Sequence, residues 1–528
     1  MYMVLNISPK NCLISFLYVF IFVVSFLVYT HNNDFSYLYH TTEETKIAQI
    51  TTHEYNLYHP LLMLDTAEVI ARLSGAETYQ EKVIAGRLAS AIFASSSVII
   101  LMIIAHMISG IAGAVAAGIL LPFSPMMIRL SHYFKEDPTF VFGITLSFLA
   151  VAVYYRKSSF RNFIFMILAM VIAASGKYVG FALLPMGIAV AILRPYRQKF
   201  RAAASATKRI GIFLSVYIVS YLVMNFQIFM RIDYIMQKLF PKVAATAAKK
   251  QDGIVALSGH GGAMVTHPWI EYIRYFFNQT GIVIPLLVVA YLVYFAFTFR
   301  KRTPVEKFMV AFLFLFTAVL SMGKVASGQY FLPQEMTCHF FAGIAIVLFL
   351  APVKQRFGNR VFVSSLASCL VLVAALLFPY AEKSLHQFQP SVDTRKALLS
   401  WMELNLGNDP AKIASDKYVL LPDVLKWSQS LSSRKNLSVV QMEYTGDLKT
   451  LINASSLGYT HVAVSASTYS RFFSSSASAS VAGGSIYDTR RKFYSELFEK
   501  GTLLWEANSP YGGIVNTPIR LYKLPPVK

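Results

Sequence analysis

Long apolar runs are the feature of this chain that most restricts what it can fold into. They recur from the amino terminus to about residue 380, and each has roughly the 17 to 25 residues that a helix needs to cross a bilayer. Only 14% of the residues are charged, against roughly 25% in globular proteins. We therefore expect a mainly α fold, a polytopic membrane bundle of about 11 transmembrane helices. The runs lie near residues 12–29, 84–107, 110–130, 138–155, 162–176, 178–194, 210–229, 280–299, 306–323, 336–352 and 361–379.

Basic residues between the apolar runs indicate which side of the membrane each loop faces. The formal net charge is +21, but Lys and Arg gather in alternate loops, as cytoplasmic loops do under the positive-inside rule. This distribution favours a lipid bilayer, and not nucleic acid, as the partner of the basic residues. It predicts a cytoplasmic amino terminus and an extracytoplasmic carboxyl-terminal domain, and we expect the membrane to be a bacterial inner (plasma) membrane. The basic loops contain Arg156, Lys157, Arg161, Arg194, Arg197, Lys199, Arg300, Lys301, Arg302, Lys354, Arg356 and Arg360.

The composition changes after Pro379, where the apolar runs stop and Ser, Asp and Lys become more frequent. We expect residues 1–380 to form the transmembrane domain and residues 381–528 a soluble α/β domain, which is a usual domain size. Periodicity predicts both kinds of element in this second domain. The helices are expected at 393–406 and 487–499, and the strands at 438–441, 461–464 and 519–524.

Acidic residues stand in two of the loops predicted to face outward. Glu43 and Glu44 follow the first apolar run, and Glu136 and Asp137 precede the fourth. Acids beside a membrane cost free energy unless water, a partner charge or a ligand compensates them. Their shared face therefore predicts a site at the membrane surface. The alternatives are a solvated acidic loop for the first pair and, for Asp137, a helix cap ahead of Pro138.

Lys177 lies between two apolar runs on the same predicted face. A lysine there suits an anionic head group, because an ammonium is a compact point charge. The alternative is a lysine that snorkels to the interface. A long glycine-containing segment at about 230–279 is expected either to cover an active site or to serve as a linker.

The order of these motifs resembles a known family, the GT-C fold glycosyltransferases of the lipid A aminoarabinose transferase and protein O-mannosyltransferase type. Glu43-Glu44-Thr45-Lys46 stands where the family has Asp-Glu, a small or polar residue and a basic residue. Tyr58-His59-Pro60-Leu61-Leu62 stands where the family has Tyr-His-Pro-Pro-Leu, and Arg87-Leu88 begins the second run. These enzymes take a sugar from a polyprenyl phosphate such as undecaprenyl phosphate, and the resemblance implies the same donor here.

The resemblance also implies roles for particular residues. Glu43 is the first candidate for the catalytic base and Glu44 the second, because an inverting displacement needs one carboxylate to take the acceptor proton. The remaining implied roles are in substrate binding. Glu136 or Asp137 would orient the acceptor or hold a sugar hydroxyl. Lys177 and Arg87 would contact the lipid phosphate.

Further expectations concern the Tyr-His motif, the segment after it, and metal ions. Tyr58 and His59 are expected to bind substrate, and the amphipathic run from Leu61 to Leu73 is expected to lie on the membrane surface and guide the lipid tail. For Arg87 the alternative is a helix-start residue that snorkels. No metal ligands and no cofactor are assigned, but paired acids are able to hold a divalent cation, so a metal is left open.

Two other classes of protein compete with the transferase. A transporter or flippase of lipid-linked or small substrates predicts ionisable residues near the bilayer midplane, whereas the acids here stand at the ends of the runs. A non-enzymatic envelope assembly protein is the other alternative. The sequence does not identify the sugar, and the acceptor is a protein, a lipid or a glycan.

Overall fold

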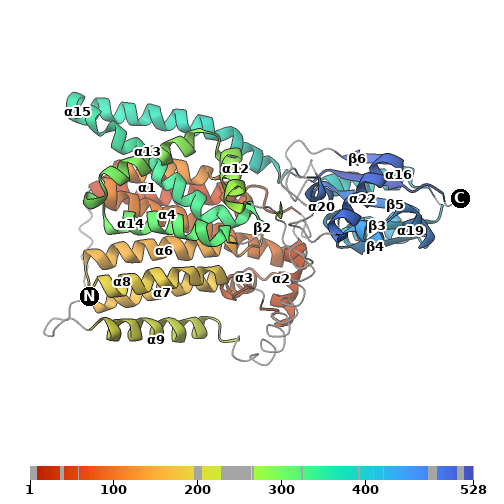
Figure 1. The fold of residues 1–528 in the computed structure, drawn as a ribbon, viewed down its shortest axis with the longest axis horizontal. Helices are drawn as coiled ribbons and strands as arrows, with labels where there is room; N and C mark the ends of the chain where they lie inside the picture. The colour runs from red at the N-terminus through yellow and green to blue at the C-terminus, as the bar shows by residue number, and fades with distance from the viewer. Residues whose placement is uncertain are drawn as a thin grey trace.

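The structure is a computed structural model of the 528-residue chain. A helical part and a smaller part built on a β-sheet lie side by side, and Figure 1 shows the sheet beyond one end of the helical bundle. We call this end of the bundle the domain end. The described residues are 9–35, 41–57, 59–195, 205–227, 263–264, 267–322, 325–389, 393–407, 409–419, 421–473, 485–507 and 517–526.

Within these residues, six helices are long and apolar enough to cross a membrane. We conclude that the chain is an integral membrane protein. The six helices are α1 (Pro9–Thr30), α4 (Tyr79–Leu120), α6 (Asp137–Arg156), α9 (Ala206–Met224), α14 (Pro304–Ser321) and α15 (Leu332–His386). Shorter apolar helices accompany them, namely α7 (Phe160–Gly176), η2 with α8 (Tyr178–Leu183, Leu184–Leu193) and α13 (Val283–Phe297).

Two of the long helices, α4 and α15, are interrupted by a glycine. Gly110 has φ 69° and Gly358 has φ 81°, values that glycine adopts without the steric penalty of other residues. Each glycine separates two apolar runs that the sequence predicted as two spans. The number of membrane crossings stays a prediction, as do the sidedness of the termini and the boundary at residue 380, which falls within α15.

Small residues bring α6 and α7 close together. A Cβ on Gly143 of α6 would lie 2.3 Å from the Cα atom of Ala173 in α7, and one on Gly176 would lie 2.7 Å from the amide nitrogen of Phe140. Such close backbone contact is typical of membrane helices with small residues at their interface. The start of α6 and the end of α7 therefore meet at the domain end of the bundle.

Short helices cover the domain end. They are α2 (Thr41–Thr52), α3 (Leu62–Leu73) and α5 (Pro125–Ser131), joined there by η1 (Leu121–Phe123), α12 (Pro268–Thr280) and η5 (Gly328–Phe331). The segment with Glu43 and Glu44, expected to be a loop, is instead the first turn of α2. Acids are favoured there because the unpaired amides give a helix start a partial positive charge. The amphipathic helix expected between Leu61 and Leu73 is confirmed as α3.

The carboxyl-terminal part, which is predicted to be soluble and is called the soluble part below, contains a five-stranded sheet of strand order β4-β3-β5-β7-β6. The strands β3, β4 and β5 are parallel, and β7 pairs antiparallel with both β5 and β6. The predicted strands are confirmed, but the inner strand β3 and the edge strand β6 were missed. Their bounds are β3 (Ala411–Asp416), β4 (Leu437–Met442), β5 (His461–Ser465), β6 (Thr502–Ala507) and β7 (Ile519–Lys523).

Helices flank this sheet, and both predicted helices are confirmed. They correspond to α16 (Thr394–Asn405) and α22 (Ser485–Lys500). The shorter helices are α17 (Leu421–Val424), η8 (Leu425–Trp427), α18 (Gln429–Ser432), η9 (Thr445–Leu448), α19 (Leu451–Ser456) and α20 (Ala466–Tyr469). In the bundle, η4 (Phe299–Lys301) joins α13 to α14, and a two-stranded pair consists of β1 (Ala263–Met264) and β2 (Val325–Ala326).

Asp416, at the end of β3, joins several elements of the soluble part. Its fully buried carboxylate accepts hydrogen bonds from the amide and hydroxyl of Thr445, at 2.8 and 2.9 Å, from the Tyr494 hydroxyl at 3.0 Å and from the Ser465 amide at 3.3 Å. Burial raises the Asp416 pKa to about 6, although these four donors partly oppose it. The carboxylate therefore holds the ends of β3 and β5 to Tyr494 of α22.

We predict that Asp416→Ala lowers the stability of the soluble part by about 3 kcal/mol, because buried donors lose their acceptor. The raised pKa means that the folded state binds a proton more tightly than the unfolded state. Its contribution to stability is lost as the pH rises through about 6, so the deficit is larger at pH 5 than at pH 8. Thermal unfolding of the purified chain at both pH values measures this. Asp409→Asn, at an exposed position, is the control, and an unchanged midpoint at pH 5 would contradict the prediction.

Candidate active site

A buried ion-pair network joins α2 to the turn before α6 at the domain end. Lys46 Nζ donates to Glu136 Oε2 and, at 2.7 Å, to the carbonyl oxygen of Phe134. The ring of His59 places Nε2 3.0 Å from the other oxygen of Glu136. Lys46 and Glu136 are both buried, and the His59 side chain is 40% exposed. Lys46 and His59 thus hold Glu136 from two sides.

The surroundings of Glu136 fix the protonation of this network. Burial opposes a charged Glu136, but the positive charges around it, that of Lys46 above all, outweigh it and hold the Glu136 pKa well below its usual range. Burial also lowers the His59 pKa to about 4, despite the attraction of Glu136. Glu136 is therefore an anion and His59 a neutral imidazole near pH 7. A carboxylate with so low a pKa is a poor proton acceptor, so Glu136 suits binding better than base catalysis.

Asp137 and Lys177 form a second pair beside the first. Lys177 Nζ lies 2.7 Å from Asp137 Oδ1 and 5.2 Å from the centre of the Tyr330 ring. The other Asp137 oxygen, Oδ2, is buried and has no hydrogen-bond partner in the described part of the chain. The Asp137 carboxylate thus pairs with Lys177 and makes no capping bond, and Lys177, 13% exposed in its side chain, does not snorkel.

Lys135 is a site residue that the sequence did not reveal. It is 4% exposed, and burial lowers its pKa, although Glu136 and Asp137 oppose the effect. In the described part of the chain its ammonium has no hydrogen bond and no ion pair, and only its backbone is bonded, to Ser90. An ammonium that is largely removed from water and has no partner is costly, so Lys135 is available to an anionic ligand.

Glu43 and Arg87 are placed differently from what their predicted roles require. Both side chains are fully buried in a two-pronged ion pair, with Arg87 Nε 3.0 Å from Glu43 Oε1 and Nη2 2.9 Å from Oε2. Glu43 Oε1 also accepts the Phe134 amide at 3.0 Å. Arg87 further donates to the carbonyl oxygens of Asn33 and Phe35. In this conformation Glu43 has no exposed oxygen for an acceptor hydroxyl, and Arg87 does not snorkel.

Glu44, one residue further along α2, points away from this pair and is exposed. Burial raises its pKa, and so does the charge of Asp423 in α17, whereas Lys426 in η8 opposes them. Glu44 therefore faces the soluble part across the domain end of the bundle. Glu44 is thus the accessible carboxylate of the two predicted candidates, whereas both oxygens of Glu43 are bonded to Arg87.

Some predicted features lie outside the described residues, and the predictions on metal ions and on midplane acids concern the described ones. Tyr58 and most of the segment 230–279 are outside them. Among the residues that the structure describes, no group of three or more His, Cys, Asp or Glu is arranged to hold a metal ion. Glu306 and Glu335, buried acids of α14 and α15, each stand in the first turn of their helix, not at the midplane position that a transporter predicts.

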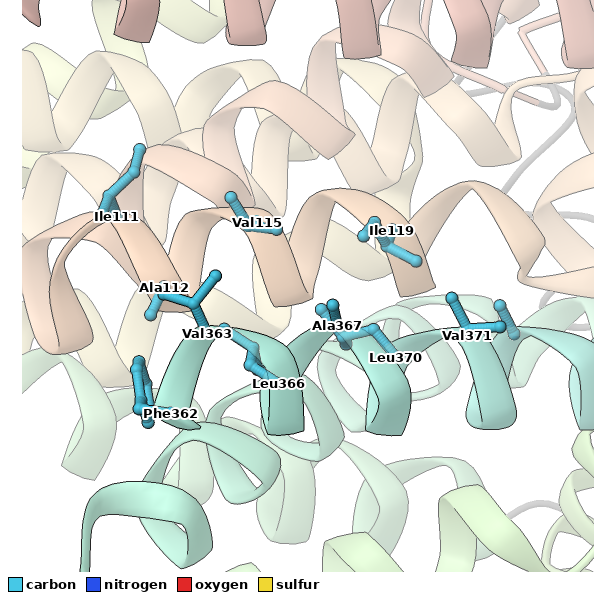
Figure 2. A pocket seen from close by; sticks show the side chains of 11 residues that line it. Ile111, Ala112, Val115, Ile119, Phe362, Val363, Leu366, Ala367, Leu370 and Val371 are labelled. Carbon is cyan, nitrogen blue, oxygen red and sulfur yellow. The ribbon is translucent and has the colours of Figure 1, made fainter. Parts of the chain in front are cut away.

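A separate apolar pocket of about 410 Å³ lies between α4 and α15. Figure 2 shows Val115 and Ile119 of α4 opposite Leu366 and Leu370 of α15. No polar side chain lines it, so it carries no group able to activate a substrate.

Comparisons with known proteins concern the fold and the family of the chain. The family model of dolichyl-phosphate-mannose-protein mannosyltransferases matches residues 15–240, which include the network described above. No curated protein matches the chain in sequence. Among solved structures, ArnT from Cupriavidus metallidurans bound to undecaprenyl phosphate is similar at 12% identity and a TM-score of 0.52. The match covers 97% of this chain and 98% of that one.

Two structures from Archaeoglobus fulgidus are also similar. The apo oligosaccharyltransferase matches at 10% identity and a TM-score of 0.53, covering 94% of this chain and 74% of that chain. The oligosaccharyltransferase AglB in complex with an inhibitory peptide and a dolichol-phosphate matches at 10% identity and a TM-score of 0.51, covering 93% and 80%. Identities this low establish a shared fold. The resemblance to GT-C transferases expected from the sequence is confirmed.

We predict that Arg87→Met lowers the stability of the bundle by about 3 to 5 kcal/mol, because it leaves Glu43 buried without its partner. The double variant Glu43→Met, Arg87→Met is expected to recover most of this loss, since two apolar side chains replace two charges. Thermal unfolding in detergent measures both, with Arg72→Met as the control for an exposed pair. Equal stability of Arg87→Met and the wild type would show that the pair is dispensable.

Proposed function

We propose that the chain is a membrane glycosyltransferase that transfers a sugar from a polyprenyl-phosphate donor to an acceptor, with inversion at the anomeric carbon. The observation that carries this proposal is the ammonium of the buried residue Lys135, which has no partner among the described residues, within a cluster of three lysines and two acids. His59 is neutral, so the cluster has an excess of positive charge. The fold shared with transferases that were solved with lipid phosphates supports the same conclusion.

The donor phosphate is assigned to Lys135, with Lys177 as the second cation. Breaking the bond between the anomeric carbon and the phosphate oxygen leaves the electron pair on the phosphate. Fixed cations in a site that excludes water stabilise that growing charge. Lys46 is already engaged by Glu136, and Arg87 by Glu43. These two cations act by holding α2, α4 and the turn before α6 in place.

Glu44 is the proposed base, and Glu43 is a positioning residue. The acceptor hydroxyl attacks the anomeric carbon, its proton passes to Glu44, and the phosphate monoester leaves. Asp137 Oδ2, which has no partner among the described residues, is positioned to accept a hydrogen bond from a sugar or acceptor hydroxyl. His59 also contributes to substrate binding, and a role for Tyr58 rests on the motif alone. No step requires a metal, although a divalent cation stays compatible with the acids.

The site lies at the end of the bundle that faces the soluble part (Figure 1). Together with the basic loops at the other end, this supports an extracytoplasmic site in an inner membrane and a cytoplasmic amino terminus. The soluble part would then stand on the acceptor side.

We expect Glu44→Gln to lower transfer about a hundredfold or more, because the amide keeps the shape and removes the base. The assay uses purified protein with labelled undecaprenyl-phosphate mannose and undecaprenyl-phosphate aminoarabinose, and follows both transfer and hydrolysis. Glu43→Gln is the matched variant, expected to reduce thermal stability together with activity. Loss of activity in Glu43→Gln at unchanged stability, with an active Glu44→Gln, would assign the base to Glu43. A wild type inactive on every such donor would favour a transporter or an assembly protein.

We also predict that Lys135→Met raises the KM for the donor about tenfold to a hundredfold, as expected for the loss of one charge-assisted bond to phosphate. The same change removes a charge on a buried residue that has no partner among the described residues, so the unfolding midpoint should stay the same or rise. Lys157→Met, exposed at the other end of α6, is the control. An unchanged donor KM in Lys135→Met would exclude Lys135 as a phosphate contact.

A further inference from the structure

Phe388 lies just beyond the end of α15, at the junction between the bundle and the soluble part. It is 1% exposed and packs with the rings of Phe35 and Tyr133, which are buried as well. The ring centres lie 5.3 Å from Phe35 and 5.6 Å from Tyr133. The closest ring is that of His132, parallel to Phe388 within 7° at 4.1 Å. We call these four side chains the junction cluster.

One side of the junction cluster fixes the turn that carries Lys135, Glu136 and Asp137. His132 is fully buried, and its ring nitrogens lie 2.6 Å from the carbonyl oxygen of Ile128 and 3.0 Å from that of His31. These contacts hold the edge of the ring, and Phe388 covers its face. The backbone leading from His132 into the turn thus begins at a residue with little freedom to move.

The other side of the junction cluster supports α2. The Phe35 ring lies 3.5 Å from the Arg87 guanidinium carbon, close enough for a cation–π contact. Arg87 in turn holds Glu43, and Glu43 accepts the amide hydrogen of Phe134. Phe388 therefore contacts Phe35, which packs on Arg87, and His132, which leads into the turn, although it is more than 200 residues away from either group of site residues in the sequence.

The chain continues from Phe388 directly into the soluble part. Thr394, in the first turn of α16, donates to the carbonyl oxygen of Thr517 before β7 at 3.0 Å. Arg395 in the same turn is 2% exposed, and its charge acts on Tyr133. The junction cluster thus connects the start of the soluble part to the site.

We propose that Phe388 is a positioning residue of the active site, through which the soluble part fixes the turn that carries Lys135, Glu136 and Asp137. This rests on the proposed transferase function. Phe388 touches no reacting group, and it acts by stacking on His132. A displacement of about 1 Å in a catalytic constellation is able to cost about a hundredfold in rate, so a loosened turn should lower kcat.

The test compares Phe388→Leu with Phe388→Tyr in the purified full-length chain. Leucine keeps an apolar side chain but cannot stack on His132, whereas tyrosine keeps the ring. We expect Phe388→Leu to lower kcat about tenfold or more with the donor KM within about threefold, and Phe388→Tyr to restore most of kcat. Phe378→Leu, half exposed on α15, is the control. A kcat within twofold of wild type in Phe388→Leu would overturn the proposal.

Amide hydrogen exchange of residues 131–137, followed by mass spectrometry, is a readout that does not need activity. Phe388→Leu is expected to exchange faster there than wild type and Phe388→Tyr, with other segments of the bundle unchanged. Equal exchange in this segment would refute the positioning role even if the transferase assay succeeds. Faster exchange in a protein that transfers no sugar would support the positioning role and reject only the proposed function.

Discussion

The buried ion pair between Glu43 and Arg87 is the interaction on which the site depends. Two fully buried charges are tolerated only when they form an ion pair with good hydrogen bonds. Here Arg87 donates to both carboxylate oxygens of Glu43. The pair joins α2 to α4, and the bond from the Phe134 amide to Glu43 adds the turn before α6. Because a helix turns by about 100° per residue, fixing Glu43 inward also decides where its neighbours on α2 point. Lys46 faces Glu136, and Glu44 faces outward.

That orientation gives the two adjacent acids different properties. Glu43 is committed to Arg87, whereas Glu44 is exposed and its pKa is raised by burial and by Asp423. The same division occurs among the lysines. Lys46 and Lys177 are paired with acids, but Lys135 has no partner among the described residues. Some charges of the site thus form ion pairs that hold its elements together, and others have no protein partner among the described residues. Among the described residues, the Lys135 ammonium and Asp137 Oδ2 are without a partner, and the proposed function assigns them to the substrate.

The sequence supplied most of the candidate residues but not their partners. Glu136, Asp137, Lys177 and His59 were identified from position and motif, and the structure brings them together. Lys135 directly precedes Glu136 in the sequence. The only available signal was its position between an aromatic residue and two acids. Strand β3 was missed because Ala411–Asp416 contains small residues and a lysine, although the strand is almost wholly buried. Its place between β4 and β5, and not its composition, makes it a strand.

By itself, the sequence determined that the chain crosses a membrane, which loops carry the basic charge, and that acids gather near the ends of apolar runs. Apolar length and charge act locally, so they can be read along the chain. Only the tertiary structure decided which charge meets which. Arg87 pairs with a glutamate 44 residues away, and Phe388, just after α15, stacks on His132, just after α5. These contacts arise because buried charges and rings take the nearest complementary group in space, and the packing of the helices sets which group that is.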